Sequence, residues 1–125
     1  MRLILASNSK TRKDIFDMVG WKYEVITSNT EENSNSTDSK QYKEISFTDI
    51  TEVYFKNVFD KDIAWYVENE KYLLNRAGYS IAGKTSIFVD KIVGDYYNIL
   101  GMPISKLYSK LNELGYSISD FEMKA

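Results

Sequence analysis

The chain has 125 residues, of which 43% are apolar and 14% aromatic, enough for one compact domain with a hydrophobic core. Sixteen Lys and Arg residues against eighteen Asp and Glu give a net charge of −2, so there is no overall basic field to hold a nucleic acid. The chain has no cysteine and no histidine, which excludes disulfides, thiolate nucleophiles, imidazole bases and Cys/His zinc sites.

The amino-terminal residues predict a strand, a helix and a second strand in succession. Residues 2–6 are a short apolar run, typical of a buried strand and far too short for a signal peptide or a membrane span. Residues 7–9 offer serine hydroxyls that can cap a helix over residues 10–19, and Gly20 provides its end. Residues 22–27 alternate as a second strand would. We therefore expect a β-α-β opening in a cytoplasmic protein without a membrane partner.

The middle of the chain predicts a loop, a strand region and a helix. Residues 28–41 are polar and indicate a solvated loop. Residues 44–55 carry β-branched and aromatic side chains that favour a strand pair or one bent strand. Asp60 can cap a helix that runs through Leu73 and ends before Gly78.

The last third of the chain continues this alternation. Residues 86–93 return to a strand pattern, and Pro103 begins a final helix that runs through Leu114 and ends at Gly115. No period of about 20 to 50 residues repeats, which argues against a solenoid. The sequence therefore predicts a mixed α/β fold.

The turn after the first predicted strand has the chemistry of a phosphate site. The free N–H groups and the positive dipole end of a helix start attract anions. Ser7 and Ser9 add hydroxyl donors, and Arg12 and Lys13 in the first helical turn can reach oxygens that the backbone cannot. From the residues alone, the alternative is a plain serine cap followed by two basic residues on a solvated face.

A second stretch matches the spacing of a P-loop. Residues 78–85 read Gly-Tyr-Ser-Ile-Ala-Gly-Lys-Thr. A P-loop follows a strand and opens a helix, whereas the residues before this stretch are helix-like and those after it are strand-like. We therefore do not expect a P-loop NTPase.

Two stretches near the ends of the chain carry a family resemblance. Leu3-Ile-Leu-Ala-Ser7-Asn-Ser9-Lys-Thr-Arg12 and Gly94-Asp95-Tyr-Tyr-Asn98-Ile-Leu-Gly101-Met-Pro103 together resemble the Maf family of nucleoside triphosphate pyrophosphatases, first known as septum-formation inhibitors. The resemblance implies a single domain with a Maf-like (inosine-triphosphatase-like) mixed sheet flanked by helices. Its expected parts are a phosphate-binding β-α-β segment (1–34), a polar junction (35–43), a carboxy-terminal part (44–120) and a tail (121–125).

The resemblance also implies roles for individual residues. It assigns phosphate binding to Ser7, Ser9 and Arg12, with Lys13 restoring charge where Thr11 replaces a family arginine. Glu32 matches the family's conserved acid and is expected to act in catalysis and as a ligand of Mg²⁺ or Mn²⁺; without the resemblance, it reads as a solvated loop residue. The signature residues are expected to support the site structurally, and they are Gly94, Asp95, Asn98, Gly101 and Pro103. Their composition indicates a turn in which Asp95 and Asn98 bond to nearby backbone amides and Gly101 relieves a strained dihedral angle.

Several family elements have no counterpart in this chain. The family's Ala- and Lys-rich helix, its strand ending in Gly-Ala-Asp-Thr and its Gly-Lys-Pro turn do not occur, so the sequence indicates a shortened sheet that lacks the usual catalytic Asp. Asp38, Asp49 or a second chain could supply the missing group.

The resemblance predicts hydrolysis of nucleoside triphosphates to monophosphate and pyrophosphate, impaired by this loss. The alternative is a non-catalytic remnant that binds a nucleotide or a partner protein. Uncovered apolar surface on a shortened sheet favours a homodimer.

Overall fold

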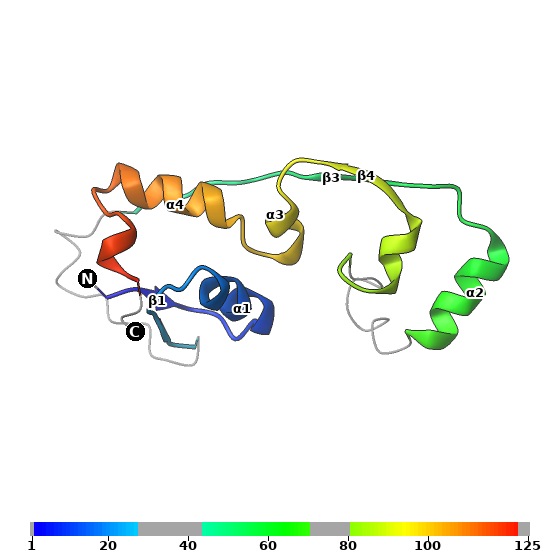
Figure 1. Ribbon diagram of the computed structural model, residues 1–125, viewed down its shortest axis with the longest axis horizontal. Coiled ribbons are helices and arrows are strands. Elements are labelled where there is room, and N and C mark those ends of the chain that lie inside the picture. Colours follow the sequence, from blue (N-terminus) through cyan, green and yellow to red (C-terminus); the bar gives the residue numbers. More distant parts are fainter. Residues whose placement is uncertain (1, 28–43, 71–80, 123–125) are drawn as a thin grey trace. The chain divides into compact units, whose positions relative to one another are not determined.

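The computed structural model describes residues 2–27, 44–70 and 81–122 (Figure 1). Its elements are mixed α/β, as predicted, with two small sheets and four α-helices among the described residues. The chain forms two compact units: unit 1 comprises Met1–Asp49 with Gly101–Ala125, and unit 2 comprises Ile50–Leu100. The prediction of one domain with four parts stays a prediction.

Unit 1 contains the expected β-α-β opening. β1 (Ile4–Leu5) pairs in parallel with β2 (Glu24–Val25), and α1 (Lys10–Met18) connects them. Both strands are shorter than predicted, but the helix agrees with the prediction to within one residue. Gly20 adopts a φ of +76°, which a glycine reaches without the penalty of a side chain, and so it ends α1 as expected.

An aromatic core lies between α1 and the carboxy-terminal part of unit 1. The Trp21 ring lies 5.4 Å from the Phe16 ring and 4.6 Å from the Phe121 ring, measured between centroids. All three side chains are buried, together with Leu5, Ile15 and Ile104. Phe121, which the sequence led us to place in a tail, is therefore part of this core.

The last helix of unit 1 follows the predicted signals. α4 (Ile104–Glu113) begins directly after Pro103, and Gly115 follows it with a φ of +97°. A short 3₁₀ turn, η5 (Ile118–Asp120), then leads to Phe121.

Unit 2 is built on an antiparallel strand pair. β3 (Glu52–Phe55) pairs with β4 (Val89–Val93), and the register skips Asp90 opposite the step from Tyr54 to Phe55. Of the two alternatives predicted for residues 44–55, the strand pair is wrong, because β3 pairs with β4 much later in the chain. The single strand is found only over residues 52–55. The remaining elements of unit 2 are α2 (Asp60–Asn69), the 3₁₀ helix η4 (Lys84–Phe88) and α3 (Tyr96–Leu100).

Two boundaries in unit 2 differ from the sequence prediction. Phe59 is the cap residue of α2 and makes no side-chain cap bond, while Asp60 is the first helical residue. An acidic side chain in a first turn is favoured by the helix dipole as well as by capping, so the same residue suits either position. Residues 86–88 belong to η4 and not to a strand, although their β-branched and aromatic side chains suggested one. The predicted extension of α2 to Leu73 lies outside the described residues.

The cap of α1 yields a first testable prediction. The Ser9 hydroxyl accepts a hydrogen bond from the Arg12 N–H at 3.3 Å, so Ser9→Ala removes a side-chain cap. We expect a loss of about 1 kcal/mol in the free energy of unfolding, measured by urea denaturation. Ser105→Ala, on the exposed surface of α4, is the control and should change stability by less than about 0.5 kcal/mol. Equal effects of the two substitutions would show that the cap does not stabilise α1.

Within the described ranges, no helix is long and apolar enough to cross a membrane.

Candidate functional site

The turn between β1 and α1 brings the predicted phosphate-binding residues together. The Ser7 hydroxyl oxygen accepts hydrogen bonds from the Ser9 N–H at 3.1 Å and from Arg12 Nη1 at 3.4 Å. All three side chains are half-buried, so they are held in place yet reach the surface. The structure therefore places Ser7, Ser9 and Arg12 together on one turn, and their role in phosphate binding stays a prediction.

The turn offers an anion several hydrogen-bond donors. Ser7 and Ser9 act as acceptors within the protein, so the hydrogen of each hydroxyl can still be donated. Lys10 and Thr11 occupy the first two positions of α1, where backbone N–H groups have no acceptor inside the helix. The first turn of α1 has no acidic side chain that would compete for these donors. Together these groups form the environment that favours phosphate at a helix start.

Arg12 links this turn to the beginning of α4. Its Nε donates to the carbonyl oxygen of Gly101 at 2.9 Å, across 89 positions of sequence and within unit 1. The guanidinium has five N–H donors, of which this bond and the bond to Ser7 use two. The other three have no protein acceptor in the part of the chain that the structure describes. Arg12 is thus anchored and still able to bind an anion.

Lys13 is half-buried on the next position of α1. Within the described ranges, its ammonium group forms no ion pair, in contrast to Lys10, which pairs with Asp14 at 3.0 Å. Lys13 therefore remains a candidate for a second cationic contact, as predicted.

Three residues of the second signature pack around Thr51 in unit 2: Asp95 and Asn98 bond to its hydroxyl, and Gly94 lies close to it. Asn98 Nδ2 donates to the Thr51 hydroxyl oxygen at 3.0 Å, and this hydroxyl donates to the Asp95 carbonyl at 2.9 Å. Gly94 has a φ of +122°, and a Cβ atom there would lie 3.0 Å from the Thr51 hydroxyl oxygen. These signature residues therefore lie in a backbone turn that packs against Thr51, while their support of a site stays a prediction.

The partner of Asn98 differs from the prediction. Asp95 binds a backbone amide as expected, since its Oδ1 accepts from the Tyr97 N–H at 2.8 Å. Asn98 was expected to do the same but donates to a hydroxyl 47 residues earlier in the chain. Sequence reasoning missed Thr51 because nothing local to Thr51 distinguishes it from other polar loop residues.

The geometry argues against a P-loop at residues 81–85, the described part of the P-loop-like stretch. Lys84 opens a five-residue 3₁₀ helix that leads into a strand, and its ammonium pairs with the buried Glu70 carboxylate at 3.2 Å. The Thr85 hydroxyl is buried and donates to the Tyr66 hydroxyl at 2.9 Å. Of the two residues that a P-loop would direct at phosphate and Mg²⁺, Lys84 is therefore engaged in an ion pair and Thr85 in a buried hydrogen bond within unit 2.

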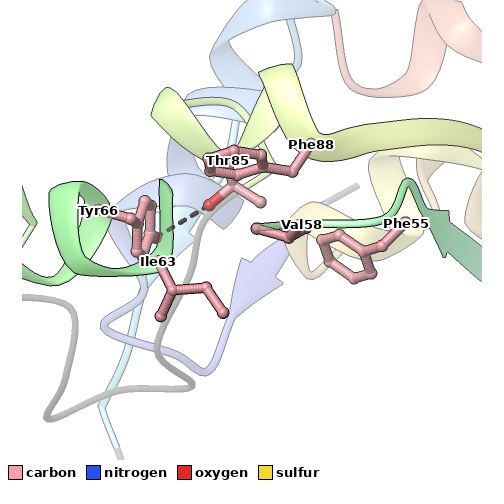
Figure 2. A pocket seen from close by; sticks show the side chains of 6 residues that line it. All are labelled: Phe55, Val58, Ile63, Tyr66, Thr85 and Phe88. Atoms are coloured by element: carbon pink, nitrogen blue, oxygen red, sulfur yellow. Dashed lines mark hydrogen bonds between the residues drawn. The ribbon is translucent and has the colours of Figure 1, made fainter. Parts of the chain in front are cut away.

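An apolar cavity of about 180 Å³ lies next to this hydroxyl pair in unit 2. Figure 2 shows the side chains that line it. None of the described residues that line it is charged, and its two hydroxyl groups, of Tyr66 and Thr85, bond to each other. The residues that line it are Phe55, Val58, Ile63, Tyr66, Thr85 and Phe88. This cavity is therefore unsuited to the triphosphate part of a nucleotide.

A second cavity, of about 370 Å³, lies beside β2 in unit 1 and is lined in part by Arg2 and Glu24. The Arg2 guanidinium donates to the Glu24 carboxylate, and this hydrogen bond lowers the pKa of the Glu24 carboxyl group. Arg2 is thus paired, and among the described residues that line this cavity only Lys22 has an ammonium group without an ion pair. The Ser7–Arg12 turn offers a phosphate more, because it combines a guanidinium with hydroxyl and helix N–H donors.

Comparisons with known proteins support the family resemblance that the Gly94–Pro103 signature carries. A family profile described as "Maf-like protein" matches residues 35–114, which is more than half of the chain. The chain belongs to the Maf family. The matched residues include the Gly94–Pro103 signature, whereas the Ser7–Arg12 turn precedes them.

Named relatives of this Maf chain include two proteins called "dTTP/UTP pyrophosphatase". The one from Carboxydothermus hydrogenoformans is 38% identical over 76 residues, which cover 61% of this chain and 41% of that protein. The one from Alkaliphilus oremlandii is 43% identical over 70 residues, covering 56% and 36%. A "Nucleoside triphosphate pyrophosphatase" from Gloeothece citriformis is 37% identical over 84 residues, covering 67% and 43%. The match thus spans less than half the length of each of these relatives.

The predicted acidic centre of this Maf chain is not among the described residues. Glu32, expected to serve in catalysis and metal binding, and the substitute Asp38 both lie outside them. Asp49, the other substitute, is described and lies 3.7 Å from the Lys106 ammonium in unit 1. Within the described ranges, no three Asp or Glu side chains gather at one place. Mg²⁺ needs only one or two protein carboxylates beside water and phosphate oxygens, so the expected acidic ligand stays Glu32, which these ranges do not include.

Proposed function

We propose that this Maf chain hydrolyses nucleoside triphosphates to the monophosphate and pyrophosphate, with the Ser7–Arg12 turn holding the phosphate chain. The observation that carries this proposal is the convergence of two serine hydroxyls, free helix N–H groups and an anchored guanidinium on one half-buried turn. The proposed type of reaction comes from the names of the relatives, two of which are called "dTTP/UTP pyrophosphatase" and one "Nucleoside triphosphate pyrophosphatase".

The contribution of the turn to the reaction is electrostatic. Phosphoryl transfer spreads negative charge over the oxygens of the reacting phosphate and its leaving group, and fixed donors stabilise that charge without reorganising. In this chain the donors are the Arg12 guanidinium, the Ser7 and Ser9 hydroxyls and the first N–H groups of α1. Lys13 adds a second positive charge near the same turn.

The acid and the cation of the reaction are proposals from the family resemblance. We propose Glu32 as the catalytic and metal-binding carboxylate and Mg²⁺ or Mn²⁺ as the cation. Such a cation, when bound, neutralises charge on the phosphate oxygens.

The finer fold assignment is also a proposal. We propose that the two strand pairs correspond to parts of a Maf-like mixed sheet that is shortened by the loss of its central elements. The observations that support this are the parallel β1–β2 pair, the antiparallel β3–β4 pair and the short match to the relatives. A cytoplasmic location and a role in septum formation stay expectations from the resemblance.

Pyrophosphate release tests the proposed activity. Nucleoside triphosphates with canonical and modified bases are incubated with the purified chain and with Mg²⁺ or Mn²⁺. We expect release that Arg12→Ala and Glu32→Ala each abolish. Arg2→Ala, which removes an exposed guanidinium paired with Glu24, is the matched control and should leave the rate unchanged. Release that persists in both Arg12→Ala and Glu32→Ala would contradict the proposal.

A second function follows if the acidic centre is lost. This alternative is a non-catalytic protein that binds a nucleotide or a partner protein, and it is favoured by the sequence itself, which lacks the family's strand ending in Gly-Ala-Asp-Thr. Nucleotide binding that depends on Arg12, without any pyrophosphate release, would support this alternative over the enzyme. Exposed apolar side chains in unit 2, such as Phe59 at 65% and Ile87 at 57% exposure, support a homodimer, which light scattering of the purified chain tests.

A further inference from the structure

The contact between Arg12 and Gly101 joins the two stretches that carry the family resemblance. Arg12 Nε and the Gly101 carbonyl oxygen are 2.9 Å apart, and the Arg12 side chain is half-buried at this contact. Gly101 has a φ of +116°, a conformation that side chains with a Cβ atom rarely adopt. The position of the carbonyl therefore depends on residue 101 being a glycine.

This contact limits how the guanidinium can meet an anion. An arginine can present two parallel N–H groups either from its side, through Nε and one Nη, or from its end, through Nη1 and Nη2. Because Nε donates to Gly101, the side edge is occupied. Nη1 donates one of its two hydrogens to Ser7, which leaves its other hydrogen and the two hydrogens of Nη2. A two-pronged contact that does not use Nε takes one hydrogen from each of these two nitrogens, which is the end edge.

We propose that Gly101 is a positioning residue of the phosphate site, and that its carbonyl holds Arg12 so that the Nη1–Nη2 edge receives the phosphate oxygens. This inference rests on the proposed function of the Ser7–Arg12 turn. It assigns the Gly-Met-Pro part of the signature a role in orienting a binding group, beyond the start of α4. Gly101 itself does not touch the phosphate.

A double-mutant cycle tests this role, with pyrophosphate as the probe and isothermal titration calorimetry as the measurement. In Gly101→Ala the new Cβ atom would lie 3.7 Å from Arg12 Nε, an ordinary contact, so the substitution acts through the backbone angle and not through a clash. We expect pyrophosphate binding about tenfold weaker, as for a lost hydrogen bond to a charged group. In the Arg12→Ala background, Gly101→Ala should have no further effect.

Gly115→Ala is the matched control for backbone strain. Gly115 also has a positive φ, of +97°, at the other end of α4, and a Cβ atom there would have nothing within 4 Å. We expect its pyrophosphate affinity to stay within about twofold of the unchanged chain. Two results would overturn the positioning role while leaving the phosphate site intact. One is an equal loss of pyrophosphate affinity in Gly101→Ala and Gly115→Ala. The other is a loss of pyrophosphate affinity in Gly101→Ala that persists in the Arg12→Ala background. A chain that binds no pyrophosphate at all would overturn the site and the positioning role together.

A second measurement does not depend on the folding of a variant. In ¹⁵N NMR spectra of the unchanged chain, the Arg12 Nε–H should be protected from exchange with water before pyrophosphate is added and should stay protected at saturation. Loss of that protection on binding would mean that the anion takes the Nε edge, which would contradict the inference.

Discussion

Replacing Arg12 by lysine is expected to weaken pyrophosphate binding by about 10-fold to 150-fold, although the charge is retained. Lysine has one ammonium group in place of the planar fork, so it cannot bond Gly101 and Ser7 and still present two parallel N–H groups to an anion. Isothermal titration calorimetry with pyrophosphate measures the change.

Arg2→Lys provides the control for this comparison. Arg2 is an exposed arginine of the same unit and is paired with Glu24, so its replacement should leave pyrophosphate affinity unchanged. If Arg12→Lys binds pyrophosphate as tightly as the unchanged chain, the guanidinium geometry is irrelevant and the site is only a region of positive charge.

Gly94→Ala is expected to lower the free energy of unfolding by about 3 kcal/mol. The alanine would be strained at a φ of +122°, and its Cβ atom would lie 3.0 Å from the Thr51 hydroxyl oxygen and 3.1 Å from the Ile50 carbonyl oxygen. The backbone cannot yield easily there, because the Thr51 hydroxyl is held by both Asp95 and Asn98. Urea denaturation followed by circular dichroism measures the loss.

Gly115→Ala separates the effect of backbone strain from that of steric overlap at the Cβ atom. It imposes a similar backbone angle with open space around the Cβ atom, so we expect a loss of only about 1 kcal/mol. Equal losses at both glycines would mean that the contact between Gly94 and Thr51 does not stabilise the turn.

The parts of the fold that were predicted correctly have local signals. The ends of α1 are marked by Ser9 and Gly20, and the ends of α4 by Pro103 and Gly115. These signals are readable from the sequence because capping groups and positive φ angles act within a few residues of a helix end. The turn with Ser7 and Arg12 was also found in this way, since its serines and its arginine lie within one helical turn of each other.

The parts that were missed depend on contacts distant in sequence. β3 pairs with β4 almost 40 positions later, and Asn98 finds Thr51 across 47 positions, neither of which a single sequence reveals. The bond from Arg12 to Gly101 spans 89 positions, and the sequence indicated only that Gly101 relieves backbone strain. Residues 86–88 were assigned to a strand on composition, although composition does not separate a strand from a short 3₁₀ helix leading into one.

The central claim is that the start of α1 binds the phosphate chain of a nucleotide, and amide NMR during a titration with a nucleoside triphosphate tests it most directly. The account predicts saturable shifts of the backbone amides from Ser9 to Arg12, together with Gly101, which reports on the anchored guanidinium. Saturable shifts confined to other parts of the chain, such as the residues around Lys84 and Thr85, with the amides of Ser9 to Arg12 unmoved, would contradict it.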